Sequence, residues 1–363
     1  MNFKPKPSEN SPTLAFGTEA KLLTVGLKPG ERIGPFTIVR MLGQGGMGTV
    51  YLAEQDEPKR NVALKLMTKL STKDKSQEQR FLREAELSSR LDHPNIVKIF
   101  SASLEERVPY MAMTYLEGME LSDYVKTRNP GLREKLLLFQ TIAEALHYAH
   151  REGIVHRDIK PGNIMVKNEG TPVLMDFGIA KNIKISDRRL TKTGEIIGTP
   201  AYMSPEQARG VRALDAQSDV YSLGAVCYEA ITGHPLYDGT TEMEILYQLV
   251  SSSPRLPRQI VPDLPAEVEA ILLKSIEKSR QKRYKNAGEM ALDIQRYLEG
   301  KKIHSRSVHA MSKVARRVRS SGKKTAIVFL CLFLLASLGA LLSRIVSLKK
   351  GPVFSLSGKE IGR

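Results

Sequence analysis

The sequence predicts an α+β protein of two lobes, in which a strand-rich half precedes a helical half and a separate apolar segment follows. Short runs of β-branched and aromatic residues alternate with turns over residues 34–116. Apolar residues spaced three and four apart predict helices over residues 117–300. Residues 325–343 contain no charged side chain. With 363 residues, the chain is long enough to bury a core in both lobes.

The net charge of +16 lies almost entirely outside this two-lobed part. Residues 1–30, 300–324 and 344–363 carry +2, +9 and +4, which leaves residues 31–299 close to neutral. A nucleic-acid-binding domain carries positive charge on its folded body, so the distribution argues against nucleic acid as a partner. It favours basic segments beside an anionic membrane surface. Only two cysteines occur, too few for a disulfide framework or a zinc site of the CxxC type.

The N-terminal residues 1–30 lack the apolar periodicity of a folded element, so we expect them to form a disordered arm. Order is expected to begin near Gly34 with the strand-like run PFTIVRML. A turn rich in glycine follows and contains Gly43, Gly45, Gly46 and Gly48. Because a strand rather than a helix comes after this turn, it argues against a dinucleotide-binding βαβ unit. It favours a hairpin lid whose backbone approaches phosphate oxygens closely.

The next strand, NVALKLM, places Lys65 on the same face as Ala63, because side chains alternate along a strand. Taken alone, Lys65 is more simply a solvated lysine on an edge strand. A small residue facing a flat ligand, beside a cation facing phosphates, nevertheless makes a consistent pair. Residues 76–91 predict a helix whose Glu84 borders the inward face. We select Glu84 as the partner of Lys65, with Glu86 as the nearest alternative.

A further strand, PYMAMTYLEG, ends in the connector that we expect to form the hinge between the lobes. Met113 would face the pocket, and Thr114 to Leu116 would offer backbone groups to the edge of a purine. The second lobe then begins with a buried helix over residues 133–151, whose apolar residues recur three and four apart. The polar residues His147, His150 and Arg151 on this helix are expected at the surface.

The stretch HRDIKPGNIMVKNEGTPVLMDFG concentrates the polar side chains of the second lobe. Asp158, Lys160, Asn163 and Asp176 flank two short apolar runs that a turn at residues 168–170 separates. A hairpin of this kind would bring all four polar groups to one edge of a cleft. One carboxylate for an acceptor hydroxyl, one carboxylate and an amide for Mg²⁺, and a cation for phosphate are the groups that phosphoryl transfer needs.

In chain order, these motifs resemble those of the eukaryotic-type serine/threonine protein kinases, most closely the bacterial membrane-anchored subfamily. The residues that carry the resemblance are Gly43, Gly45, Gly48, Val50, Lys65, Glu84, His156-Arg157-Asp158, Lys160, Asn163, Asp176-Phe177-Gly178 and Ser204-Pro205-Glu206. Their joint occurrence is far more specific than any single motif. The departures are Leu64, Ile159 and Ser204, in place of the family's usual Ile, Leu and Ala. The resemblance implies a bilobal protein kinase fold over residues 31–300.

The resemblance also implies the chemistry of the predicted cleft. Asp158 would accept or orient the proton of a serine or threonine hydroxyl on a protein substrate. Lys160 would neutralise the transferring γ-phosphoryl group of ATP. Asn163 and Asp176 would hold Mg²⁺, with Mn²⁺ as an alternative. Lys160 so close to the catalytic aspartate, together with Thr199 in GTPAYMSPE, resembles the serine/threonine rather than the tyrosine branch.

ATP would be held by the lysine–glutamate pair and by an apolar pocket. By the resemblance, Lys65 is fixed by Glu84 and contacts the α- and β-phosphates. The implied nucleotide-binding residues are Leu42, Gly43, Gly45, Gly46, Gly48, Val50, Ala63, Lys65, Met113, Thr114, Leu116, Met165 and Met175. Each apolar member is individually also a plausible core residue, and the prediction depends on the whole set.

Regulation and support are implied for several other positions. Residues 179–203 match the activation segment, in which Thr191 and Thr193 correspond to sites of autophosphorylation in bacterial relatives. Arg157 beside the catalytic aspartate would pair with a phosphorylated threonine. Asp219 would brace the catalytic loop, and Arg283 would pair with Glu206. The alternative from another functional class is a catalytically silent scaffold, which the intact polar set disfavours.

Beyond the kinase-like region, residues 301–324 predict a basic linker and residues 325–343 a transmembrane helix. The uncharged run spans about 28 Å as a helix, close to the thickness of a hydrocarbon core. Basic residues are denser before it than after it, which places the kinase-like region in the cytoplasm of a bacterium and the tail, 344–363, outside the inner membrane. Membrane lipid is therefore an expected partner, and homodimerisation stays an option. The alternative is a soluble kinase whose tail packs on itself.

Overall fold

The computed structural model describes most of the predicted two-lobed region. The described residues are 26–45, 48–67, 75–104, 109–177, 200–211 and 213–305, with the side chains of residues 75–80 and 84 left out. All of them belong to one compact unit, Met1–Ser305. The greater part of the predicted arm, most of the predicted linker, and the membrane span and tail lie outside the described residues.

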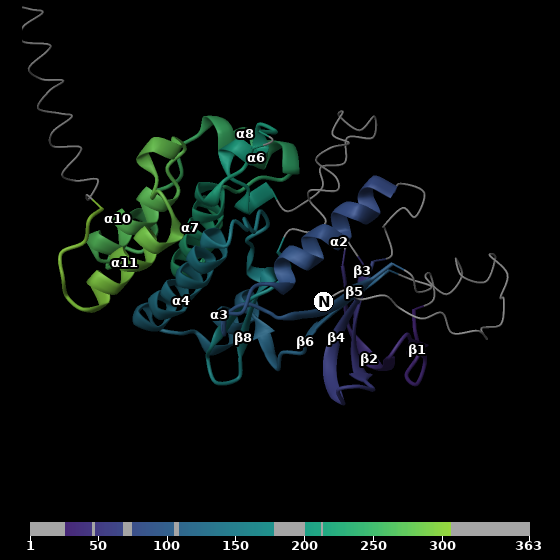
Figure 1. The fold of residues 1–363 in the computed structure, drawn as a ribbon. Coiled ribbons are helices and arrows are strands. Elements are labelled where there is room, and N and C mark those ends of the chain that lie inside the picture. The colour runs from purple at the N-terminus through teal and green to yellow at the C-terminus, as the bar shows by residue number, and fades with distance from the viewer. Residues whose placement is uncertain are drawn as a thin grey trace, which may run out of the picture. The chain divides into compact units, whose positions relative to one another are not determined.

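The first lobe contains a six-stranded antiparallel sheet with the strand order β1-β2-β3-β4-β6-β5 (Figure 1). Its strands are β1 (Arg32–Ile33), β2 (Phe36–Gly45), β3 (Gly48–Gln55), β4 (Arg60–Leu66), β5 (Ile99–Ser103) and β6 (Tyr110–Thr114). Helix α2 (Lys75–Ser89) contacts β5. In β4, Val62 and Leu64 belong to one apolar cluster and Ala63 to another. The predicted alternation along this strand, which sets the direction of Lys65, is therefore confirmed.

The run IVKIF at residues 96–100 favours a strand, but the strand in the structure begins later, since ladder pairing of β5 starts at Ile99. Ile96 instead forms a single parallel bridge with Leu174. The backbone N–H of Val97 also donates to the carbonyl of Leu174 at 2.8 Å. This short contact joins the first lobe to the hairpin that carries the predicted polar set.

That hairpin belongs to a second, three-stranded sheet of β7 (Gly118–Glu120), β8 (Ile164–Lys167) and β9 (Pro172–Leu174). The predicted turn between its last two strands is confirmed, because Gly170 has φ +88° and its N–H donates to the carbonyl of Lys167 at 2.8 Å. Gly118 allows the close approach of β7 to β8, since a Cβ atom there would lie 2.2 Å from the carbonyl oxygen of Val166. The two polar stretches on either side of the turn are thereby held side by side.

The second lobe is helical, as predicted. Its elements are α3 (Leu121–Arg128), α4 (Leu132–Arg151), η1 (Pro161–Asn163), η2 (Pro200–Tyr202), α6 (Pro205–Ala208), α7 (Ala216–Thr232), α8 (Glu242–Ser251), α9 (Pro257–Ile260), α10 (Ala266–Ser275), η3 (Arg280–Lys282) and α11 (Ala287–Leu298). Helices α4, α7 and α11 contact one another, and α10 contacts α7 and α11, around a shared apolar core (Figure 1). Asp215 caps the start of α7, and Gly233 ends it with φ +73°.

The described body continues to Ser305, slightly beyond the predicted boundary at residue 300. The buried carboxylate of Asp293 on α11 accepts hydrogen bonds from the backbone N–H groups of His304 at 2.7 Å and Ser305 at 2.9 Å. Ile303 packs against the core of the helical lobe. Within the described part of the chain, no helix combines the length and apolar character needed to cross a membrane.

A buried ion pair joins α6 to the segment before α11. Arg283 Nη1 lies 2.8 Å from Glu206 Oε1, and Ser218 Oγ donates to the same oxygen at 2.8 Å. Burial raises the pKa of Glu206, but the hydrogen bond and charge of Arg283 outweigh this and lower it, so the carboxylate stays ionised. The predicted pairing of Arg283 with Glu206 is confirmed.

Replacing Arg283 by methionine is expected to lower the free energy of unfolding by about 3–5 kcal/mol, because it leaves the Glu206 carboxylate buried without its partner. Chemical denaturation measures the loss. The matched control is Arg280→Met, since Arg280 is more exposed and lies 3.5 Å from the same carboxylate. Equal losses for the two variants would contradict the assignment of the main stabilising contact to Arg283.

Candidate active site

Asp219 on α7 holds the backbone of the catalytic loop, the segment that contains His156, Arg157 and Asp158. This fully buried carboxylate accepts hydrogen bonds from the backbone N–H of His156 at 2.7 Å and of Arg157 at 2.8 Å. The predicted brace is therefore present. Its third contact was not predicted: His150 Nε2 lies 2.8 Å from Asp219 Oδ2, and the His150 side chain is 6% exposed. The expectation that His150 lies at the surface is wrong, because α4 turns this face toward α7.

His156 links the loop to the residue preceding Asp176. Its Nε2 lies 2.9 Å from the carbonyl of Met175, and its Nδ1 lies 3.3 Å from the backbone nitrogen of Asp158. Nε2 must donate to the carbonyl, and Nδ1 must accept from the N–H, so this geometry requires the neutral ring. Burial lowers the pKa of His156 despite nearby carboxylates, in agreement with a neutral ring.

Stability is accordingly expected to fall as the pH drops below about 6.5, the ordinary pKa of histidine. The unfolded chain takes up a proton in that range whereas the buried His156 of the folded state does not, so protons favour unfolding. His156→Gln keeps an N–H for the carbonyl of Met175 and should make the dependence of melting temperature on pH shallower between pH 8 and 5. His234→Gln, at an exposed position, is the control. The same slope for all three proteins would refute the assignment.

Two residues of the site have left-handed backbone conformations that favour glycine. Arg157 has φ +65° and Asp176 has φ +54°. Such conformations cost about 1–3 kcal/mol each and persist only where surrounding contacts impose them. Here Asp219 holds the N–H of Arg157, and the ion pair of Asp176 with Lys65 holds the other residue. Backbone strain is thus concentrated at Arg157, which precedes Asp158, and at Asp176.

The structure brings together the polar groups predicted from the hairpin. Lys160 Nζ lies 3.4 Å from Asp158 Oδ2. Asn163 Nδ2 donates to the carbonyl of Asp158 at 2.7 Å and lies 3.2 Å from Oδ2 of the same residue. The carbonyl of Asn163 accepts from the N–H of Met175 at 2.9 Å, which fixes the approach to Asp176. A carboxylate, an ammonium group and an amide therefore converge beside the second carboxylate.

Lys65 reaches this cluster from the first lobe. Its Nζ lies 2.7 Å from Asp176 Oδ2, and its side chain is 13% exposed. Burial raises the pKa of Asp176, but the charge and hydrogen bond of Lys65 outweigh burial and lower it. The side chain of Glu84, the predicted partner of Lys65, lies outside the described atoms, although its backbone is part of α2. Within the described atoms, Lys65 therefore contacts the predicted metal ligand.

The glycine-rich hairpin leaves room beside β2 and β3. A Cβ atom added at Gly43 or Gly45 would meet nothing within 4 Å, and neither residue has a positive φ. Gly48 differs, since a Cβ there would lie 1.8 Å from the carbonyl oxygen of Leu66. Glycine is thus required by packing only at the last of these positions. At the first two, the missing side chains suit the close approach of an external group such as a triphosphate. Gly46 lies outside the described residues.

Most of the predicted adenine-binding residues lie in one apolar cluster on the Lys65 side of the sheet. The members are Val50, Ala63, Met113, Leu116 and Met175. Leu42, which is 36% exposed, and the half-buried Met165 lie outside this cluster. The backbone N–H of Thr114 donates to the carbonyl of Lys98 at 2.9 Å, so this N–H is already engaged. These five residues thus form one apolar surface, and their part in binding adenine stays a prediction.

The predicted metal ligands provide oxygen donors of the kind that Mg²⁺ prefers. Both described hydrogen bonds of the Asn163 amide use its nitrogen, so its oxygen is the atom suited to a cation. Asp176 adds a carboxylate with a lowered pKa. Mg²⁺ commonly takes one or two protein ligands together with phosphate oxygens. Among the described residues, no group of three or more His, Cys, Asp or Glu side chains is arranged to hold a metal ion.

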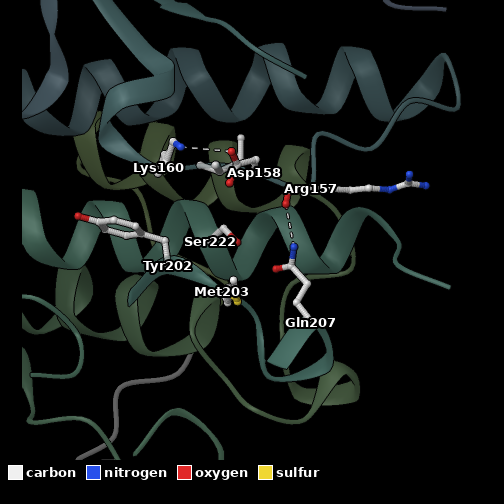
Figure 2. A pocket seen from close by; sticks show the side chains of 8 residues that line it. Arg157, Asp158, Lys160, Tyr202, Met203, Gln207 and Ser222 are labelled. Atoms are coloured by element: carbon white, nitrogen blue, oxygen red, sulfur yellow. Dashed lines mark hydrogen bonds and ion pairs between the residues drawn. The ribbon is translucent and has the colours of Figure 1, made fainter. Parts of the chain in front are cut away.

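A shallow pocket beside Asp158 and Lys160 contains residues that the sequence did not single out. Tyr202, Met203, Gln207 and Ser222 line it together with the catalytic loop (Figure 2). Tyr202 and Met203 lie at the end of the predicted activation segment, residues 179–203, whereas Gln207 and Ser222 follow it and belong to none of the motifs. Gly178, Thr191, Thr193 and Thr199 lie outside the described residues, so their predicted roles stay predictions.

Comparison with known proteins agrees with this geometry. The family described as "Protein kinase domain" matches residues 36–294, and the chain belongs to that family. Similar curated proteins are serine/threonine-protein kinase PknB of Mycolicibacterium smegmatis, 38% identical over 270 residues, and a probable PknB of Bifidobacterium longum, 39% identical over 277 residues. The matches cover 73% and 74% of this chain but only 43% and 40% of those relatives. The chain therefore matches less than half of each relative's length.

A solved structure shows the same fold. The kinase domain of PknI from Mycobacterium tuberculosis superposes with a TM-score of 0.60 at 28% sequence identity. The alignment covers 75% of this chain and 99% of the PknI domain. The described body thus has the bilobal protein kinase fold.

Proposed function

We propose that the chain transfers the γ-phosphoryl group of ATP to serine and threonine hydroxyls of proteins. The observation that carries this proposal is the convergence of Asp158, Lys160 and Asn163 with the Lys65–Asp176 ion pair. These groups come from both lobes and from three separate segments of the chain. Membership of the protein kinase family and the similarity to serine/threonine-protein kinases of other bacteria support the same activity.

In the proposed reaction, Asp158 accepts the proton of the acceptor hydroxyl as that oxygen attacks the γ-phosphorus and the bond from phosphorus to the β,γ-bridging oxygen breaks, so that ADP leaves. Lys160, beside it, offsets the negative charge of the transferring group, and Asn163 keeps the Asp158 carboxylate oriented through its amide nitrogen. Lys65 binds phosphate oxygens. Asp176 and Asn163 would hold Mg²⁺, which would supply additional charge neutralisation at the phosphates.

Incubating the full chain in detergent with γ-labelled ATP and a basic protein substrate tests the activity. Label should appear in the substrate with Mg²⁺, disappear with EDTA, and return when Mg²⁺ or Mn²⁺ is restored in excess. A preparation that binds ATP but incorporates no label under any metal would favour the scaffold alternative.

We infer that phosphorylation of Thr191 and Thr193 activates the enzyme through Arg157. The guanidinium of Arg157 extends away from Lys160 and the pocket beside Asp158 (Figure 2), and its Nε is buried without a described partner. Converting both threonines to alanine is expected to lower kcat several-fold, because the phosphates that would engage Arg157 are lost. Thr240→Ala is the control outside residues 179–203. Equal rates for the double variant and the parent would contradict the inference.

We further propose that residues 325–343 anchor the kinase to the bacterial inner membrane, with the kinase domain on the cytoplasmic side. The uncharged run and the basic residues before it support this proposal. In fractionated cells the full chain should remain in the membrane pellet after an alkaline wash, whereas a chain ending at Ser305 should be released. Recovery of the full chain in the supernatant without detergent would favour the soluble alternative.

A further inference from the structure

Gln207 on α6 connects the catalytic loop to the segment behind it. Its side-chain Nε2 donates to the carbonyl oxygen of Arg157 at 2.8 Å, across 50 residues of sequence (Figure 2). Its Oε1 accepts from the backbone N–H of Ser204 at 2.9 Å, and Ser204 Oγ accepts from the N–H of Gln207 at 3.3 Å. One amide therefore completes the capping box of α6 and also reaches the catalytic loop.

The carbonyl that Gln207 holds belongs to the peptide group between Arg157 and Asp158. The N–H of the same peptide group lies 3.3 Å from His156 Nδ1. Both polar atoms of the peptide group that leads into the catalytic aspartate are thus held by side chains. This peptide group also follows the strained residue Arg157, whose φ is +65°. A strained peptide needs contacts that prevent its rotation, and a rotation here would redirect the Asp158 carboxylate.

Gln207 lies on a part of α6 whose position is fixed by buried contacts. The neighbouring Glu206 is fixed by the buried ion pair with Arg283 and by the hydrogen bond from Ser218 Oγ. Gln207 itself lines the pocket that also contains Asp158 and Lys160. A side chain on a helix held in this way fixes the position of its hydrogen-bond partner more firmly than a side chain on a loop does.

We propose that Gln207 is a positioning residue for Asp158, acting through the Arg157 carbonyl. The proposal rests on the phosphoryl-transfer activity proposed above. Gln207 contacts no reacting group; it fixes the peptide plane from which the Asp158 side chain projects. The competing interpretation is that Gln207 only stabilises α6 through the capping box, and two substitutions separate these roles.

Gln207→Glu keeps an oxygen for the N–H of Ser204 and removes the N–H₂ donor. Glutamate is a good residue at this position of a capping box, so the start of α6 is preserved while the Arg157 carbonyl loses its donor. Ser204→Ala does the reverse, because it removes the hydroxyl from the cap and leaves the amide bridge in place. Alanine lacks only the hydroxyl oxygen of serine, so it fits the same buried position.

The experiment compares the full-length parent, Gln207→Glu and Ser204→Ala in detergent with Mg²⁺ and saturating ATP. The turnover number kcat is calculated per molecule that binds nucleotide, so that unfolded protein does not lower it. KM for ATP and the melting temperature are measured for each of the three proteins. We expect kcat of Gln207→Glu to fall by about tenfold or more, as misplacement of a catalytic group predicts. Its KM for ATP should stay within about twofold of the parent, because the bridge lies away from the nucleotide-binding residues. Ser204→Ala should lower the melting temperature with little change in kcat.

An unchanged kcat in Gln207→Glu, or a loss of kcat shared equally with Ser204→Ala, would overturn the proposal. Should Gln207→Glu not fold, the uncharged Gln207→Met takes its place, and parental kcat per nucleotide-binding molecule in that variant would refute the positioning role. Failure of the proposed activity itself would be recognised separately, because the parent would then incorporate no more label than Asp158→Asn.

Discussion

Asp158→Asn is expected to lower kcat by about 10³-fold, the middle of the range for loss of a general base. Asparagine has the same shape as aspartate and preserves the contacts with Lys160 and Asn163 approximately. Its neutral amide, however, takes up no proton from the attacking hydroxyl. Because the acceptor hydroxyl is affected rather than the nucleotide, KM for ATP should change little. Initial rates over a range of ATP concentrations measure both parameters.

Asp92→Asn is the matched control for this substitution. Asp92 is also an aspartate in an ion pair, with Lys98 Nζ 2.9 Å away, but its side chain is 80% exposed. We expect parental rates for that variant. Activity of Asp158→Asn within about tenfold of the parent would show that another group accepts the proton, and the assignment of Asp158 would then be wrong.

Lys65→Met is expected to lower kcat/KM for ATP by about 100-fold or more, as does the loss of other groups that stabilise charge at the reacting centre. The phosphates lose a cation, and the Asp176 carboxylate loses the ion pair that fixes its position.

The control is Lys59→Met, because Lys59 precedes the same strand and its side chain is 81% exposed, paired with Glu54. Its kinetics should match those of the parent. If Lys65→Met had parental kcat/KM at low ATP and low Mg²⁺, the Lys65–Asp176 contact would have no part in nucleotide binding.

The sequence predicted the features that depend on local patterns. Strand alternation correctly placed Lys65 with Ala63, since the period of two is fixed by backbone geometry. The turn at residues 168–170 was recognisable from its glycine, and a tight hairpin necessarily brings its two polar flanks together. The order of the motifs then predicted the bilobal fold.

The features that the sequence missed depend on contacts between distant elements. His150 was assigned to the surface because helical periodicity treats histidine as polar, whereas its partner Asp219 lies 69 residues away. The Lys65–Asp176 pair spans 111 residues and the Gln207–Arg157 bridge spans 50. Which of several polar side chains meets a given partner is decided by packing between the helices, and no local pattern encodes it.

The most direct test of the central claim is phosphoamino-acid analysis of a protein substrate after incubation with the full chain, Mg²⁺ and γ-labelled ATP. The proposed function predicts labelled phosphoserine and phosphothreonine in the reaction with the parent, and neither above background with Asp158→Asn or Asp176→Asn. Labelled phosphotyrosine in their place, or equal labelling by the parent and Asp158→Asn, would contradict the claim that this cleft phosphorylates serine and threonine through Asp158.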